Sequence, residues 1–170
     1  MQKVLLCACC CLLVQAFLGL GCMGYQLGSS LPDGLEVVHV PVFTNETDEP
    51  NLEVIATRAT IAEFQRDGSL SIGEENRADV ILRARLTSFS LDPLRFERDD
   101  ATTAQEYRMR IQADVQLIER RTGDVLVNRR VDGEQDFELT GDLSSAKRIH
   151  LPEAANDLAT RIVRASTELW

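Results

Sequence analysis

The sequence predicts an α+β domain, in which two helices cover one face of a four-stranded mixed sheet in the order β-α-β-β-β-α. A strongly β-branched segment is followed by a segment with helical spacing. Three segments then alternate apolar and polar residues, and a second helical segment ends the chain. Both helices can bury their apolar stripes on the same side of the sheet. The strands are expected at residues 36–43, 78–89, 107–117 and 125–139, and the helices at 52–66 and from Pro152 onward.

Residues 36–43 (EVVHVPVF) predict the first strand, with apolar side chains on both faces. Pro41 cannot donate to a β-ladder, so it is expected near an edge or a strand end. Asp48 is the expected N-cap of the helix at residues 52–66, and Gly68 suits a left-handed C-cap. If the strands on either side of this helix are neighbours, they are parallel.

The helix at residues 52–66 carries apolar residues on more than one side. Leu52 and Ile55 lie on one stripe, whereas Val54 and Ile61 lie largely on another. Two interpretations remain open from the sequence. The helix is broadly buried, or its second face contacts a partner protein.

A β-hairpin is predicted over residues 107–139, because apolar and polar residues alternate with period two on both sides of a turn at Gly123. Residues 90–104, which precede it, are highly charged and are expected to form a long loop, either mobile or a contact surface. The final helix is expected to begin at Pro152, with Leu151 just ahead of it as a hydrophobic staple.

The N-terminus has the three-part pattern of a secretory signal peptide. A single base, Lys3, precedes an apolar stretch that ends in small residues before Cys22. The alternative is a transmembrane helix, for which the stretch is slightly short and lacks basic flanking residues. We therefore expect a signal peptide at residues 1–21, a lipidated Cys22 with a tether at residues 22–34, and one domain at residues 35–170.

Composition excludes several classes of function. The chain has 27 acidic and 18 basic residues, a net charge of −9, which argues against nucleic acid as a partner. Its two histidines, His39 and His150, are too few for a histidine-rich metal site. Four of the five cysteines lie in the predicted signal peptide, so no internal disulfide is expected. No nucleophile or general base has the partners that catalysis requires, so we expect neither an enzyme nor a cofactor.

Several short segments, in order along the chain, resemble the LPS-assembly lipoprotein LptE family. The segment Cys22-Met23-Gly24-Tyr25-Gln26-Leu27-Gly28 is similar to the start of the mature family members, although Met23 is an extra residue. The segment from Leu31 to Phe43 is similar to the family's turn and first strand, and Asn45-Glu46-Thr47 to its approach to the first helix. Thr122-Gly123-Asp124 resembles its hairpin turn.

The resemblance implies a lipoprotein anchored to the periplasmic side of the outer membrane. Its partner would be the large β-barrel LptD, with which it assembles lipopolysaccharide into the outer leaflet. Family members act as a plug and an assembly chaperone for the barrel, and can bind lipopolysaccharide. The alternative is another outer-membrane lipoprotein with a small α+β module, serving as an activator or as a subunit of a secretion pore.

Five arginines are expected on one face of the sheet, where they could bind the phosphates of lipopolysaccharide. Planar guanidinium groups on one surface suit bidentate phosphate contacts. The alternative is cross-strand pairing with Asp79, Asp114 and Asp132, which the alternation places at similar positions. A second candidate surface is the hairpin tip with Arg120 and Arg121. The five arginines are Arg83, Arg85, Arg108, Arg110 and Arg130.

Overall fold

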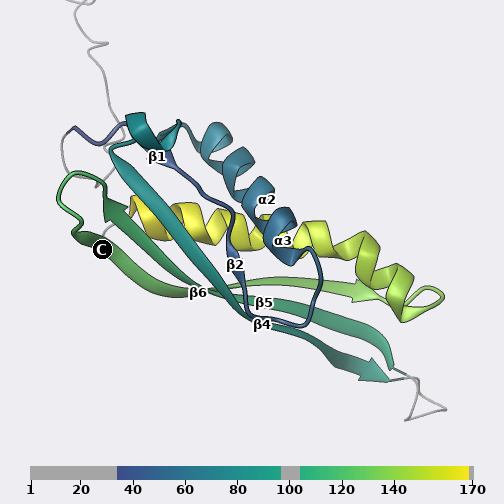
Figure 1. Cartoon of the computed structure of the whole chain (residues 1–170). Coiled ribbons are helices and arrows are strands. Elements are labelled where there is room, and N and C mark those ends of the chain that lie inside the picture. The colour runs from purple at the N-terminus through teal and green to yellow at the C-terminus, as the bar shows by residue number, and fades with distance from the viewer. Residues whose placement is uncertain (1–33, 97–103, 169–170) are drawn as a thin grey trace, which may run out of the picture.

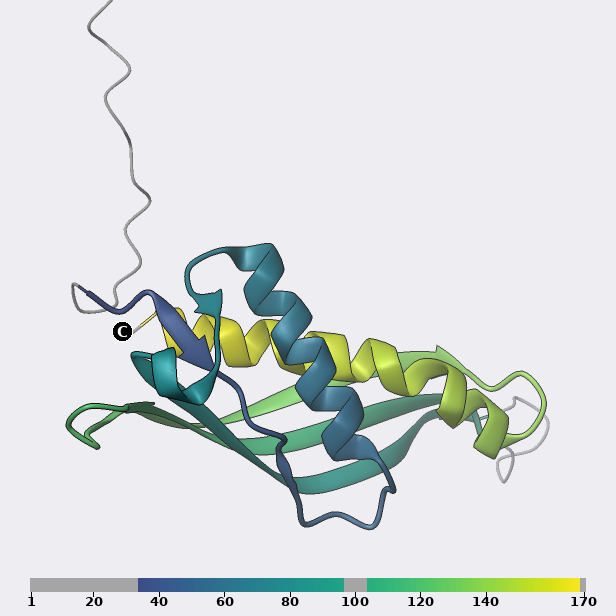
Figure 2. The ribbon, with the colours of Figure 1, turned by 45° about the horizontal axis from the view of Figure 1, so that its top comes forward.

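A computed structural model describes residues 34–96 and 104–168. The α+β prediction is confirmed: α2 (Leu52–Asp67) and α3 (Leu143–Thr167) lie together on one face of a mixed sheet. Figures 1 and 2 show an elongated arrangement in which no helix of the described residues covers the other sheet face. The core lies between the helices and the sheet.

The prediction of four strands is wrong, because the described residues form a six-stranded sheet. The strand expected at residues 36–43 is β1 (Val37–His39), which is only three residues long. Two strands of two residues each, β2 (Thr44–Asn45) and β3 (Ser71–Ile72), were not expected. β3 pairs with β1. Strands of two residues leave no alternation to recognise. The other strands are β4 (Val80–Phe96), β5 (Ala104–Glu119) and β6 (Val125–Glu138).

The sheet has the order β3-β1-β4-β5-β6, with β2 also pairing with β4. β1 and β4 flank α2 in sequence and are parallel neighbours, as expected. β5 and β6 form the predicted antiparallel hairpin, and β4 pairs antiparallel with β5 along its whole length. Val42, expected within a strand covered on both faces, lies outside any strand and is 68% exposed.

The long loop predicted at residues 90–104 is wrong. β4 continues to Phe96 and β5 begins at Ala104, so only residues 97–103, outside the described ranges, separate them. Charged side chains in this stretch lie opposite charges on β5, with Asp92 paired to Arg108 and Arg95 to Glu106. Register shifts near Arg95 disturb the alternation, which is why the sequence shows no period of two there.

The helix predicted at residues 52–66 is confirmed, but its N-cap is Asn51 rather than Asp48. Asn51 has a positive φ of 62° and makes no capping bond through its side chain. Gly68 closes the helix in the left-handed conformation, as expected, and its N–H donates to the carbonyl of Phe64.

The expected start of the last helix at Pro152 is wrong, since α3 begins at Leu143. Asp142 caps the helix by accepting a hydrogen bond from the Ser145 N–H at 2.9 Å. Pro152 therefore lies inside the helix, where proline removes one backbone donor. The apolar face around it is buried and holds the helix across this position: Leu151, Ala154, Ala155, Leu158 and Ile162.

Candidate functional site

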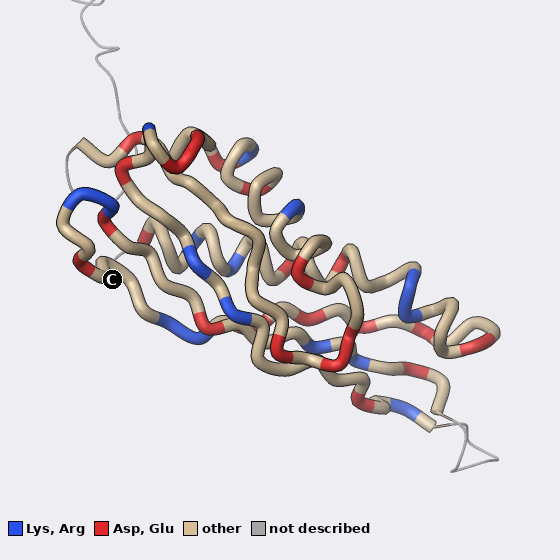
Figure 3. Tube along the Cα trace, viewed as in Figure 1, with Lys and Arg blue, Asp and Glu red and all other residues tan. Residues whose placement is uncertain are grey.

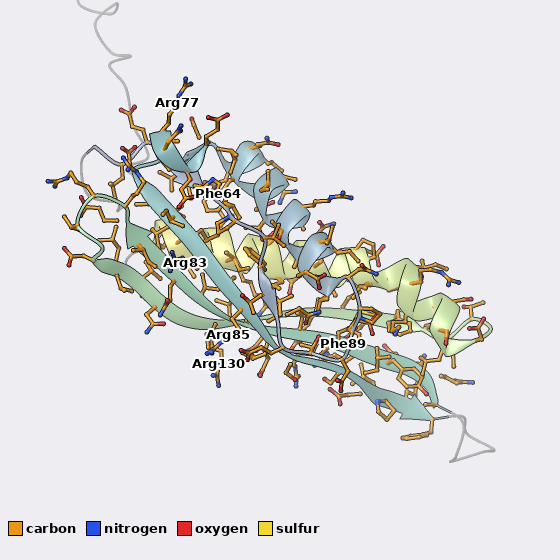
Figure 4. The ribbon with its side chains drawn as sticks, viewed as in Figure 1. Phe64, Arg77, Arg83, Arg85, Phe89 and Arg130 are labelled. Atoms are coloured by element: carbon orange, nitrogen blue, oxygen red, sulfur yellow. The ribbon has the colours of Figure 1, made fainter. Side chains whose placement is uncertain are left out.

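Strand pairing brings five arginines onto the sheet face that carries no helix, which we call the open face. Arg83 and Arg85 come from β4, Arg108 and Arg110 from β5, and Arg130 from β6. The predicted common face is therefore confirmed. Figure 4 shows Arg85 and Arg130 lying close to each other on the side of the sheet away from the helices.

Asp114 joins the three strands in the middle of the open face. It lies opposite Arg85 on β4 and opposite Arg130 on β6. Arg85 donates a hydrogen bond to it at 3.0 Å and Arg130 at 2.8 Å. These bonds, Arg130's first and then Arg85's, lower the pKa of Asp114, and the pKa of Arg130 is raised by the same contact. One carboxylate thus holds two guanidinium groups side by side.

Farther along the open face, each arginine has its own carboxylate. Arg108 makes two parallel hydrogen bonds to Asp136, each 2.7 Å long, and Arg110 makes one of 2.9 Å to Glu134. The bonds from Arg108 lower the pKa of Asp136, and those to Asp136 raise the pKa of Arg108. The positive charge at this end of the face is therefore balanced.

The sequence identified only part of this pairing. Of the three acids it proposed, only Asp114 makes an ion pair with an open-face arginine in the described residues. Asp79 instead accepts the backbone N–H groups of Glu36 and Val37. Glu134 and Asp136 were missed, although both follow Arg130 at even spacing and so share its face.

At the other end of the open face lies a depression of about 590 Å³. It is lined by four arginines and one acid, Asp114, together with neutral polar residues. In two of the four, Arg83 and Arg129, the side chain makes no hydrogen bond or ion pair within residues 34–96 and 104–168. The sequence did not indicate Arg129, because the alternation along β6 assigns it to the same face as Val127 and Val131, which is the face toward the helices. The four arginines are Arg83, Arg85, Arg129 and Arg130.

The remaining predicted site residues lie elsewhere. Arg120 donates from Nε to the carbonyl of Ala78 at 2.5 Å, so it fastens the β5–β6 turn to the start of β4. Arg121 is at the turn with its side chain 82% exposed and contacts Glu119 at 3.4 Å. Neither lines the depression. Cys22, the signal peptide and the tether up to residue 33 lie outside the described residues.

Residues 35–166 match the family model described as LptE: Lipopolysaccharide-assembly. The chain belongs to the LptE lipopolysaccharide-assembly family. The resemblance found in the sequence is thereby confirmed, and LptE is a non-enzymatic component of lipopolysaccharide assembly. No curated protein matches this chain by sequence. Within the part of the chain that is described, no helix is both long and apolar enough to cross a membrane.

Solved structures of bacterial proteins share the fold of this chain. Protein XCC0632 from Xanthomonas campestris has a TM-score of 0.58 at 10% identity, covering 78% of this chain and 83% of its own. The hypothetical protein CT253 from Chlamydia trachomatis has a TM-score of 0.56 at 11% identity, covering 78% and 96%. The PelC dodecamer from Paraburkholderia phytofirmans has a TM-score of 0.50 at 16% identity, covering 83% and 93%.

Proposed function

We propose that this protein is the lipid-anchored partner of an LptD-type β-barrel, and that the two assemble lipopolysaccharide into the outer leaflet of the outer membrane. The family match over residues 35–166 carries the proposal. The protein would act as a plug and chaperone of the barrel from the periplasmic side. Lipid on Cys22, including palmitate, would hold it at the membrane after removal of residues 1–21.

Co-purification tests the partnership. The full-length protein, tagged and extracted from its native membrane in mild detergent, is expected to bring along one large outer-membrane β-barrel as a stable complex. Mass spectrometry identifies the companion. Recovery of the lipoprotein without any large barrel would refute the partnership and favour the second candidate, an activator or a secretion-pore subunit built on the same small module.

We further propose that the open face binds phosphate groups of lipopolysaccharide, mainly at the end with the depression. There four arginines and a single acid line the depression, and the side chains of Arg83 and Arg129 have no protein partner within the described ranges. Arg108 and Arg110, whose charges Asp136 and Glu134 balance, are expected to contribute less. Arg120 and Arg121 are peripheral to this surface and would act through long-range attraction.

Charge reversal separates these contributions. With lipopolysaccharide vesicles as the ligand, Arg83→Glu with Arg130→Glu should weaken binding about tenfold, since each exposed contact contributes up to roughly 1 kcal/mol. Arg108→Glu with Arg110→Glu should weaken it less, by about threefold, because these reversals add repulsion but remove no guanidinium group that is free to contact phosphate.

A double variant on the helical side of the molecule, Arg58→Glu with Arg77→Glu, controls for net charge. Both residues are exposed, and Figure 4 shows Arg77 directed away from the sheet. Circular dichroism checks the fold of each variant. Equal losses of lipopolysaccharide binding in all three double variants would show that binding depends on overall charge and not on the open-face arginines. The proposed partnership with the barrel would be unaffected by that result.

A further inference from the structure

The two long edges of the sheet are protected to different extents. Along β6, α3 approaches so closely that a side chain at Gly133 would collide with Leu158. Asp157 of α3 also accepts the backbone N–H of Glu134 at 2.8 Å, which occupies a donor of β6. Nearer the turn, the exposed charge of Arg129 discourages an added strand. The chain itself therefore covers the β6 edge around Gly133 and Glu134.

The opposite edge belongs to β4, and only its first half is covered. β1 pairs with Val80 and Ile81, and β2 with Arg85 and Leu86. The Glu46 N–H then donates to the Leu86 carbonyl at 3.0 Å. Beyond this point β4 pairs only with β5 in the part of the chain that is described. Figure 1 shows β4 continuing as the outermost strand.

Burial changes at the same point of β4. Five of the seven residues from Val80 to Leu86 are buried, whereas none of the ten from Thr87 to Phe96 is. Phe89 and Leu91 are half-buried against the margin of the core, which leaves apolar surface next to the open backbone edge. A strand with open backbone groups on one side and apolar side chains beside them is able to pair with another strand.

An acidic loop borders this open edge. A depression of about 290 Å³ lies between Glu46, Asp48 and Glu49 on the loop after β2 and Thr87, Ser88 and Phe89 on β4. Lys147 neutralises Glu49 at 2.7 Å, and Arg85 approaches Glu46 at 3.6 Å. Asp48 is exposed and makes no ion pair with any described residue. Figure 3 shows the acidic residues of this loop beside β4.

We propose that β4 accepts, from Ser88 to Asp92, an additional strand supplied by an extended, basic segment of a partner protein. Backbone hydrogen bonds to the open edge would provide the affinity. Asp48, together with the half-exposed Glu46 beside it, would select lysine or arginine, and Phe89 with Leu91 would contact apolar residues of the added strand. Pro93, which lacks an N–H, and the charge of Arg95 end the usable edge, so it spans about 17 Å.

Amide hydrogen exchange of the full mature lipoprotein in detergent micelles tests this proposal. The probes are two short peptides, one alternating lysine with valine and the other alternating glutamate with valine. We expect the lysine peptide to slow exchange within residues 88–92 about tenfold and the glutamate peptide to have no effect. Residues 125–131 of β6 should remain unchanged with both peptides.

Charge variants provide the matched comparison. Glu46→Lys with Asp48→Lys should weaken binding of the lysine peptide about tenfold, because two favourable contacts become repulsive. Glu74→Lys with Glu75→Lys changes the net charge equally at exposed positions that do not line the depression, and should leave binding intact. Absence of protection, equal protection by both peptides, or protection of β6 instead would overturn the proposal. The partnership with the barrel is tested separately by co-purification.

Discussion

At the scale of single residues, Gly133 determines how closely α3 packs on β6. A Cβ atom there would lie 2.4 Å from the Cβ of Leu158 and 2.7 Å from the carbonyl oxygen of Ala154. Backbone atoms of a helix cannot yield as a flexible side chain can. We expect Gly133→Ala to lower the free energy of unfolding by about 3 kcal/mol, measured by urea denaturation.

Gly141 supplies the comparison for this prediction. It has a φ of 86° and open space around its Cα, so Gly141→Ala adds only backbone strain, about 1 kcal/mol. A loss at Gly133 no larger than that at Gly141 would show that the close packing of α3 is not what requires glycine at this position.

The pair between Arg108 and Asp136 gives stability that depends on pH. Because Arg108 donates two hydrogen bonds to Asp136, the pKa of this carboxyl is lower in the folded protein than in the unfolded chain. Its contribution is therefore present above about pH 4 and is lost as the pH falls through the lowered value. Asp136→Asn should flatten the acid decline of the unfolding free energy, measured by denaturation from pH 6 downward.

Arg108→Gln supplies the partner for a double-mutant cycle. It should flatten the same decline, and the double variant should add nothing further, since the two residues act as one pair. The effect is small, as for other exposed ion pairs. Acid declines that run parallel in the wild type and Asp136→Asn would contradict the assignment.

At the scale of elements, α3 contains in its interior a proline that the sequence predicts at the start of the helix. Pro152 cannot donate to the carbonyl of Arg148, one turn earlier, which costs about 3 kcal/mol in a regular helix. Proline also restricts the unfolded chain, which returns up to about 1 kcal/mol. Pro152→Ala should therefore raise the free energy of unfolding by about 2 kcal/mol, measured by urea denaturation.

The neighbouring exposed substitution Glu153→Gln should change stability by less than about 0.5 kcal/mol. A Pro152→Ala variant that is less stable than the wild type would mean that the ring of Pro152 contributes to the position of α3 over the sheet.

At the scale of the whole molecule, the described chain starts at the same end as the β5–β6 turn and the C-terminal end of α3 (Figure 1). The far end of β4 lies at the opposite end. The tether from Cys22 to residue 33 can span about 40 Å if fully extended.

We expect Cys22→Ser to abolish incorporation of labelled palmitate, whereas the wild type should carry the label on Cys22. Label retained by the variant, or an intact Met1 in the wild type, would contradict the proposed anchor.

The sequence by itself determined the α+β class, the hairpin, α2 and the common face of five arginines. Each of these follows from local spacing, since alternation or helical periodicity fixes which side chains share a face. The family resemblance also came from short segments of sequence, and the family model confirms it. Arg83 and Arg130 could therefore be placed on one surface before any strand pairing was known.

Only the tertiary structure decided the short strands, the length of β4 and the start of α3. β2 and β3 consist of two residues each and exist because longer strands pair with them. Strand register also determined which acids neutralise which arginines. It thereby separated Arg108, which is balanced, from Arg83, whose side chain has no partner among the described residues. Pairing across strands depends on residues far apart in the chain, whose separation carries no periodic signal, so folding alone brings them together.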